Sequence, residues 1–395
     1  MYSNSLPVPD SEAVAHSHRL VTEIEKAINE AGGLIPFSEF MALALYAPGL
    51  GYYSAGVRKL GADGDFITAP EISPFFSQCV ARQCQPVLAA VDDGVILELG
   101  AGSGIMAAEL LMELEHLNSL PEQYLILEVS ADLRQRQQET LQTNVPQLFD
   151  RVQWLERLPS EPLRGVILAN EVLDALPVQR FRLDESAVSE FYLGLADPNN
   201  NATESPFVWQ TLPTGDDSLR TAVEALRPSL PIGYVSEINL ALPAFLQSVA
   251  DSLAAGMVLL IDYGFPSHEY YHPQRDQGTL MCHYRHQAHS DPLILIGLQD
   301  ITAHVNFTAV ADAAFAAGLE VSGYANQANF LMACGLPEML LALNPDDTKS
   351  YLLKTQQAKT LIMPSEMGEL FKVMALTRHL EIPLLGFTQD ETVKL

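Results

Sequence analysis

The sequence has few basic residues for its length. Its 22 lysines and arginines stand against 49 aspartates and glutamates in 395 residues, which gives a formal net charge of −27 at pH 7. Nucleic-acid binding depends on lysine and arginine clusters that neutralise phosphates, so the composition argues against DNA or RNA as a partner. An acidic chain attracts a cationic peptide or an arginine-bearing protein surface, although such a charge also serves solubility alone.

Cysteines and long apolar runs are also scarce. No uncharged apolar run reaches the 18 residues of a membrane span, and the first ten residues resemble neither a secretion signal nor a mitochondrial presequence. These absences predict a cytoplasmic protein without a membrane span. The cysteines lack the close pairs of a zinc site and the density of a disulfide framework, so we expect buried thiols in a reducing compartment. They are Cys79, Cys84, Cys282 and Cys334.

The most informative segment that is present joins an apolar strand to a cluster of glycines. Residues 95–104 read VILELGAGSG, and residues 105–114 have a helix-forming composition. Gly100 and Gly102 allow the backbone to turn sharply and to approach a ligand without a Cβ atom in the way. The amides that begin the helix would face the same edge of the sheet, which predicts a nucleotide-type cofactor site.

Two acidic residues accompany these glycines. Glu98 lies two residues ahead of the first glycine, and a G-x-G-x-G pattern ending at Gly104 with an acid there resembles the first motif of class I S-adenosylmethionine-dependent methyltransferases. Glu128 follows the apolar residues 124–127, and a carboxylate at the tip of a second parallel strand can accept hydrogen bonds from two ribose hydroxyls. A dinucleotide site and a purely structural turn are the alternatives. Ile105 argues against the dinucleotide site, whose fingerprint has a glycine at that position.

Apolar strands alternate with helices from residue 95 onward, which favours a parallel sheet covered on both faces. We therefore predict an α/β fold with a doubly wound, mostly parallel sheet. The chain exceeds what one ordinary core spans, so a smaller accessory domain is also expected. The expected strands are 95–99, 124–128, 151–155, 165–170, 257–262, 319–324, 371–377 and 383–387, and the expected helices are 11–31, 73–90, 103–115, 130–143, 240–254, 307–317, 327–343 and 347–357.

The pattern divides the chain into two regions. Residues 1–90 are predicted to form an N-terminal helical and glycine-rich lid segment, and residues 91–395 the sheet domain. Two insertions interrupt that domain, at about 178–235 and 263–300. The first contains short strand patterns around the turn-rich DPNNNATESP, and the second is rich in histidine and tyrosine with little periodicity.

Four further segments resemble one family. They read GADGDFITAPEIS (61–73), LANEVLDALPVQRF (168–181), LLIDYGFPSHEYY (259–271) and GTLMCHYRHQAHSDPLILIGLQDITAHVNFT (278–308). With the glycine motif, in this order and over nearly the whole chain, they resemble the MidA-like family of class I methyltransferases. That family includes the mitochondrial complex I assembly factor that methylates an arginine of a complex I subunit. The resemblance implies a Rossmann-like methyltransferase sheet, S-adenosylmethionine as cofactor and N-methylation of a protein arginine.

The segment LANEVLDALP supplies the candidate catalytic residues. Its strand would end opposite the methyl donor, so Asn170, Glu171 and Asp174 are expected where cofactor and substrate meet. Asn170 is assigned to the cofactor. A guanidinium needs carboxylates that hold it bidentately while one nitrogen faces the methyl group, and Glu171 and Asp174 share a face if the segment is a helical turn. A charge at a helix N-terminus and a turn-forming aspartate are the alternatives for these two carboxylates.

The segment 61–73 is expected, from the resemblance, to fold back over the cofactor as a lid or wall. Thr68 is assigned to cofactor binding, and Asp65 and Glu71 to substrate binding. Asp262, at the end of a later strand, is a third substrate-binding candidate. For Thr68, Asp65 and Glu71, the alternative is a glycine-rich loop that leads into a helix cap.

His304 is predicted as a general base or as a residue that orients a carboxylate, against the alternative of a structural histidine. The family usually has aspartate where this chain has Asn306, which puts an acid or base role there in doubt. His283, His286 and His289 recur every three residues, but no second ligand cluster supports zinc. We therefore predict no metal site.

Two other functions compete with protein arginine methylation, for which the predicted partner is a basic protein such as a complex I subunit. A non-catalytic assembly protein that keeps the cofactor fold is opposed by the intact glycines and acids of the cofactor motif. A small-molecule O-methyltransferase would have an apolar pocket with a base such as His304 instead of paired carboxylates.

Overall fold

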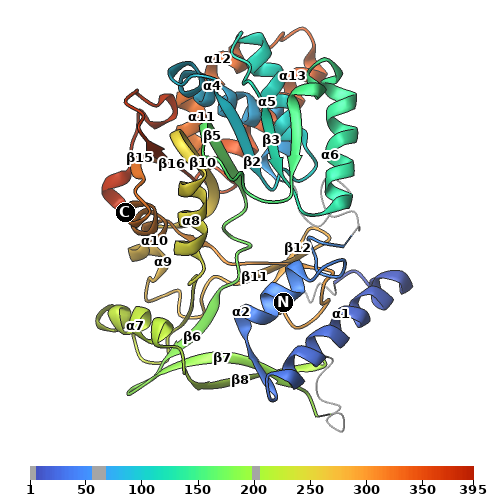
Figure 1. The fold of residues 1–395 in the computed structure, drawn as a ribbon, viewed down its shortest axis with the longest axis vertical. Helices are drawn as coiled ribbons and strands as arrows, with labels where there is room; N and C mark the ends of the chain where they lie inside the picture. Colours follow the sequence, from blue (N-terminus) through green and yellow to red (C-terminus); the bar gives the residue numbers. More distant parts are fainter. Residues whose placement is uncertain (1–5, 56–67, 198–204) are drawn as a thin grey trace. The chain divides into compact units, whose positions relative to one another are not determined.

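The computed structural model describes residues 6–55, 68–197 and 205–395. The chain divides into two compact units (Figure 1). The first unit consists of residues 1–66, 174–242 and 268–304, and the second of residues 67–173, 243–267 and 305–395. In the described part of the chain, no helix is both long and apolar enough to cross a membrane.

The second unit is built on an eight-stranded sheet. The strands β4, β3, β2, β5 and β10 are parallel neighbours in that order, and β16 pairs antiparallel with both β10 and β15. The short strand β14 pairs with the end of β10. The strands are β2 Val95–Leu99, β3 Tyr124–Leu127, β4 Val152–Leu155, β5 Leu163–Asn170, β10 Leu253–Phe265, β14 Val305–Asn306, β15 Glu320–Asn326 and β16 Phe371–Arg378.

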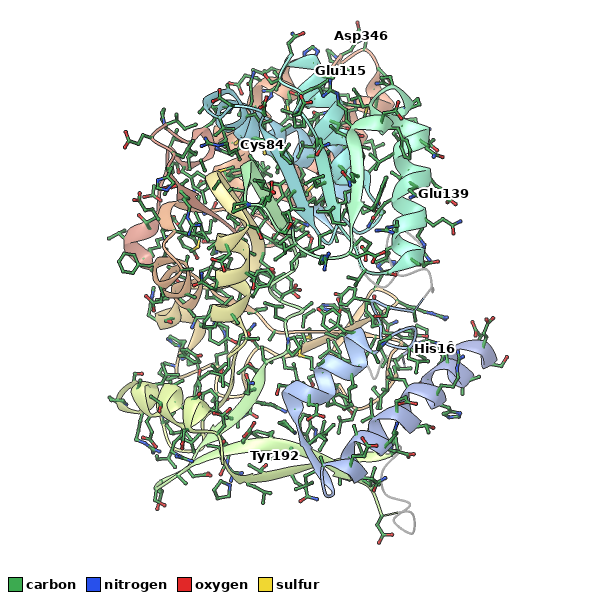
Figure 2. All side chains as sticks on the ribbon, in the orientation of Figure 1. His16, Cys84, Glu115, Glu139, Tyr192 and Asp346 are labelled. Carbon is green, nitrogen blue, oxygen red and sulfur yellow. The ribbon has the colours of Figure 1, made fainter. Side chains whose placement is uncertain are left out.

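Helices pack against this sheet and bury a large apolar core with it. Buried side chains of α4 and α5 join those of β2, β3 and β5 in one cluster, and Cys84 of α4 lies inside it (Figure 2). All four cysteines of the chain are buried free thiols, as expected. The helices are α3 Ala69–Ile72, α4 Pro74–Ala90, α5 Ile105–His116, α6 Ala131–Asn144, α8 Leu242–Asp251, α10 Phe307–Ala316, α11 Gln327–Ala333, α12 Leu336–Leu341 and α13 Thr348–Ile362.

Two predicted elements near the C-terminus are wrong. The single helix expected over 327–343 is two helices, because the chain leaves the helical conformation at Gly335, whose φ is +95°. The strand expected over 383–387 is a short 3₁₀ helix at Leu385–Phe387. There Phe387 is buried against Phe330, with ring centroids 5.7 Å apart, so tertiary packing decides the conformation.

The first unit contains a five-stranded sheet and a separate three-stranded sheet. In the former, β1 of the N-terminal segment pairs antiparallel with β7 of the predicted first insertion. The elements are α1 Ser11–Glu30, β1 Leu34–Pro36, α2 Phe37–Tyr46, β6 Gln179–Leu183, β7 Val188–Leu195, β8 Phe207–Pro213, α7 Asp217–Leu226, β9 Val235–Ile238, α9 Ser267–Tyr270, β11 Met281–Tyr284, β12 Gln287–His289 and β13 Asp300–Thr302.

The two units divide the chain differently from the predicted boundary at residue 90. Helix α4 carries Phe76, Val80 and Val87 into the core of the second unit, so residues 68–90 belong with the sheet. Helices α1 and α2 bury Leu20 and Phe40 in a cluster with side chains of the insertions. The N-terminal segment and the insertions therefore fold together.

Candidate active site

The turn after β2 has the geometry that the glycine motif predicts. Gly100, Gly102 and Gly104 have φ values of +66°, +55° and +82°, a region that side-chain-bearing residues rarely adopt. Gly104 is the N-cap of α5 and has no side chain to cap the first turn. The start of α5 therefore presents main-chain amides at the carboxyl end of the parallel strands, which suits a polar ligand.

Glu128, directly after β3, is held rigidly. Its Oε1 atom accepts the N–H of Ser130 at 2.8 Å, and its Oε2 atom accepts Nε2 of Gln137 at 3.0 Å. Burial raises the pKa of the Glu128 carboxyl, while these hydrogen bonds lower it. Each oxygen has lone pairs beyond the one so used, so this carboxylate fits a vicinal diol such as that of a ribose.

The described part of the predicted lid segment reaches the glycine turn. Ser103 Oγ, within the turn, donates a hydrogen bond to Oε1 of Glu71 on α3. Thr68 is the N-cap residue of α3, but its side chain makes no capping hydrogen bond. These contacts put Glu71 beside the expected cofactor loop. Asp65 lies outside the described residues.

Asn170 and Glu171 form a polar pair where β5 ends. Asn170 Nδ2 donates to Oε1 of Glu171 at 3.2 Å, and the Glu171 N–H donates to the Ile261 carbonyl of the neighbouring strand at 2.8 Å. Glu171 has a φ of +53°, unusual for a residue with a side chain and frequent at functional sites. The buried Oδ1 atom of Asn170 has no hydrogen-bond partner in the described part of the chain. The pair therefore offers acceptor atoms to a ligand.

Asp262 stabilises the loop that follows this pair. Its Oδ2 atom accepts the N–H of Leu173 at 2.9 Å, and its Oδ1 atom accepts the N–H of Tyr263 at 2.9 Å. The side chain is only 1% exposed, and Lys372 is its partner across the β10–β16 register. These contacts favour loop positioning over the predicted substrate contact.

Glu98, predicted to be a cofactor ligand, is a buried residue of β2. Its side chain is 2% exposed, and its Oε2 atom accepts the hydroxyl of Tyr124 at 2.7 Å. Burial raises the pKa of Glu98 to about 7, and the Tyr124 hydrogen bond lowers it. Glu98 is thus a core residue bonded to Tyr124, and its direct contact with the cofactor stays a prediction.

Asp174 and His304 belong to the first unit, whereas Glu171 belongs to the second. Residues 171–178 contain no helix, so the condition under which Glu171 and Asp174 would share a helical face is not met. Asp174 is buried, and its backbone carbonyl accepts the N–H of Ala303 at 3.0 Å. Burial lowers the pKa of His304 to about 4, with further lowering by Arg275. His304 is therefore a weak base.

The first unit also has a tyrosine–aspartate group, a half-buried Tyr53 and a buried Asp300, that no sequence pattern indicated. The Tyr53 hydroxyl donates to both carboxylate oxygens of Asp300, at 2.9 and 3.0 Å. The ring of Tyr53 stacks on that of Tyr46, with centroids 5.6 Å apart. Burial raises the pKa of Tyr53, and the charges of Asp300 and Asp174 raise it further. These residues are far apart in sequence, so no local pattern identifies them.

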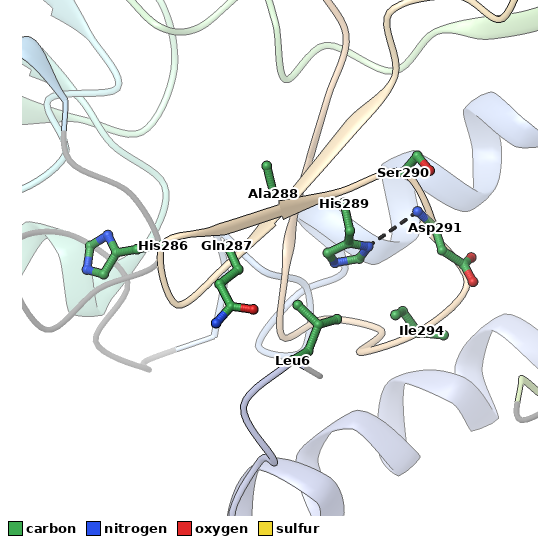
Figure 3. A pocket seen from close by; sticks show the side chains of 8 residues that line it. All are labelled: Leu6, His286, Gln287, Ala288, His289, Ser290, Asp291 and Ile294. Atoms are coloured by element: carbon green, nitrogen blue, oxygen red, sulfur yellow. Dashed lines mark hydrogen bonds between the residues drawn. The ribbon is translucent and has the colours of Figure 1, made fainter. Parts of the chain in front are cut away.

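A pocket of about 520 Å³ lies in the first unit beside the β11–β12 hairpin (Figure 3). Its lining includes His286 and His289, and Nδ1 of His289 accepts the N–H of Asp291 at 3.3 Å. None of the predicted site residues lines it. Across residues 6–55, 68–197 and 205–395, no three histidine, cysteine, aspartate or glutamate side chains are arranged to hold a metal ion.

The parallel sheet, the positive-φ glycines after its first strand and the acid after its second define a class I S-adenosylmethionine-dependent methyltransferase with a Rossmann-like fold. Residues 79–325 match the family model described as "Putative S-adenosyl-L-methionine-dependent methyltransferase". The chain belongs to this family, the MidA-like methyltransferases.

A solved structure resembles this chain over nearly its whole length. It is a Burkholderia thailandensis protein described as a "likely methyl transferase" bound to S-adenosyl-homocysteine. The two chains are 43% identical over 99% of this chain and 100% of the other, with a TM-score of 0.94. The demethylated cofactor in that relative agrees with S-adenosylmethionine as the cofactor here, which the glycine turn and Glu128 fit.

The names of several relatives state an activity. The protein arginine methyltransferase NDUFAF7 of Danio rerio is 29% identical over 91% of this chain and 90% of its own. Its homologue from Drosophila melanogaster is 27% identical over 97% of this chain and 91% of its own. Both are named mitochondrial, which contradicts the cytoplasmic location that we expected. The lack of a recognisable presequence in ten residues was too weak a basis for assigning a compartment.

Proposed function

We propose that this methyltransferase acts on a guanidinium nitrogen of an arginine in a protein. The observation that carries this proposal is the Asn170–Glu171 pair at the end of β5, beside the β2 strand that leads into the glycine turn. The names of the relatives as protein arginine methyltransferases support it.

The pair suits a substrate that is rich in hydrogen-bond donors. A guanidinium has five N–H donors and no acceptor. The Glu171 carboxylate can pair with its charge, and the unpartnered Oδ1 atom of Asn170 can accept another N–H. The hydrogen bond between Asn170 and Glu171 fixes the orientation of both acceptors.

The reaction needs an aligned nucleophile and an acceptor for one proton. S-adenosylmethionine, when bound, supplies a methyl group on a positively charged sulfur. We assign to Glu171 the alignment of the guanidinium and the removal of its proton, since burial makes His304 a weak base. Glu128 and the glycine turn would hold the cofactor, with Glu71 and Thr68 beside the turn. Asp262 would keep the Glu171 loop in place.

The first acceptor to test is a subunit of respiratory complex I, to which the sequence resemblance points. We would incubate the full chain with methyl-labelled S-adenosylmethionine and solubilised complex I lacking arginine methylation. Hydrolysed protein would then be analysed for methylarginines. Methyl groups that mild base releases would show that methyl esters had formed, and methyllysine would show that lysine is the acceptor. Either product without methylarginine would contradict the proposal.

Glu171→Gln tests the assigned residue. This variant should bind S-adenosylmethionine within about threefold of the wild type but lose at least about 100-fold in methyl transfer, the scale of general-base catalysis. Calorimetry would give the affinity and label incorporation the rate. Glu161→Gln, at an exposed site ahead of β5, is the matched control and should keep full activity. Full activity in Glu171→Gln would refute the role of the carboxylate.

A further inference from the structure

Gln137 of α6 joins two parts of the cofactor site. Its side chain is fully buried, and its Nε2 atom donates to the Gly102 carbonyl at 3.1 Å and to Oε2 of Glu128 at 3.0 Å. Its Oε1 atom accepts the indole N–H of Trp154 at 2.9 Å. One amide thus contacts the glycine turn, the acid after β3 and a side chain of β4.

The orientation of this amide follows from its partners. The indole of Trp154 is only a donor, so it must face the oxygen of Gln137. The nitrogen then faces two acceptors, the Gly102 carbonyl and the Glu128 carboxylate, one for each of its hydrogens. A flipped amide would place oxygen against both acceptors and nitrogen against the indole N–H. The arrangement therefore allows only one orientation.

The backbone of α6 also lies close to the glycine turn. A Cβ atom on Gly104 would lie 3.0 Å from the Cα atom of Gln137, closer than neighbouring atoms normally approach. Glu128 is held from its other side by the N–H of Ser130. Gln137 therefore sets the position of the second carboxylate oxygen relative to the turn.

We propose that Gln137 is a positioning residue for S-adenosylmethionine. It fixes the Glu128 carboxylate and the Gly102 peptide relative to each other, so that both meet the cofactor together. Its effect falls on the affinity for the cofactor and for its demethylated product, and not on the methyl-transfer step. This inference depends on the cofactor and not on arginine as the acceptor.

Gln137→Met tests the contacts without adding charge. It keeps a side chain of similar length but removes both donors. We expect affinity for S-adenosylmethionine and S-adenosylhomocysteine, measured by calorimetry, to fall by at least about 10-fold, as when a hydrogen bond to a charged group is lost. The turnover rate at saturating cofactor should stay within about twofold. Wild-type affinity in a folded Gln137→Met protein would overturn the proposal.

Gln137→Glu should make cofactor affinity depend on pH, which substitution of a purely structural residue would not do. When protonated, the new carboxyl can donate to Glu128; when ionised, it repels Glu128 and removes the donor. Cofactor affinity should therefore fall by about 10-fold or more between pH 5.5 and pH 8, relative to the wild type. Gln142→Glu, at an exposed position of α6, is the control and should follow the wild type. A Gln137→Glu profile parallel to the wild type would refute the inference.

Trp154→Phe tests the role of the Gln137 amide in a second way, which is needed if substitution of Gln137 itself prevents folding. It leaves Gln137 in place but removes the N–H that selects the amide orientation. Cofactor affinity should fall by about threefold or more, with the turnover rate at saturating cofactor unchanged. Circular dichroism and thermal melts would confirm a folded protein. Unchanged affinity in this variant would count against the proposed role of the amide.

Discussion

Burial of the Glu98 carboxyl has a consequence that depends on pH. Its pKa is raised from an ordinary value of 4.5 to about 7, because the folded protein removes the carboxylate from water. Below pH 4.5 the group is protonated in both the folded and the unfolded chain. Between pH 4.5 and pH 7 the carboxyl ionises in the unfolded chain but stays protonated in the folded chain. The stability that protonated Glu98 contributes is therefore lost over that range, by about 3 kcal/mol, and the loss is complete once pH has risen through the folded-state pKa.

Glu98→Gln should remove this dependence. Between pH 5 and pH 8, the free energy of unfolding of the wild type should fall by about 2 to 3 kcal/mol more than that of the variant. Denaturant unfolding at both pH values measures the difference, and Glu122→Gln, at an exposed site, controls for the change in net charge. Equal pH slopes in wild type and Glu98→Gln would show that this carboxyl does not ionise in that range.

Single residues also show where sequence reasoning succeeds and where it fails. The φ values of Gly100, Gly102 and Gly104 follow from the need to turn tightly between strand and helix, so the motif alone indicates them. The same motif does not show that the Glu98 side chain enters the core. Gln137 belongs to no motif, and the one local signal is a glutamine four residues before Leu141, on the buried face of α6. Its partners come from β3, β4 and the glycine turn and are known only from the fold.

The loop after β5 depends on an element distant in sequence. Asp262 of β10 holds the N–H of Leu173 and thereby the segment that contains Glu171. Asp262→Ala should remove the carboxylate that accepts the buried N–H of Leu173 and the half-buried N–H of Tyr263, and reduce stability by about 2 to 4 kcal/mol. We also expect the turnover rate to fall at least about 10-fold while the affinity for S-adenosylmethionine changes less than threefold.

Unfolding, calorimetry and methyl-transfer rates together check this prediction. Asp262→Asn, which keeps one acceptor oxygen, should recover part of the lost stability and rate. Asp312→Ala, at an exposed position of α10, removes the same charge and should behave as the wild type. A stable Asp262→Ala protein with normal turnover would mean that the loop needs no such support.

Among the elements, the strands and helices with strong periodicity were predictable. Strand β2 lies at the predicted residues 95–99, and α5 and α6 begin within two residues of expectation. The helix break at Gly335, where the backbone takes a positive φ, was not predicted. Nor was the 3₁₀ helix at Leu385–Phe387, because packing of Phe387 against Phe330 decides it. The division into units was also missed, since the pairing of β1 with β7 joins residues about 160 positions apart.

Net charge acts on the whole molecule and gives its own test of the proposed acceptor. A net charge of −27 should speed encounter with a basic, arginine-bearing protein at low ionic strength. Salt screens this attraction over a distance of about 10 Å at 0.1 M. The kcat/KM for a basic acceptor should therefore fall about 10-fold between 25 and 250 mM NaCl, while the affinity for the cofactor changes less than twofold.

The control is an acceptor in which basic residues away from the target arginine are neutral. Its kcat/KM should be lower at low salt and depend less on salt, because the long-range attraction acts on its total charge. If both acceptors showed the same flat profile, the acidic composition would serve solubility alone, and recognition of the acceptor would depend on short-range contacts such as those of Asn170 and Glu171.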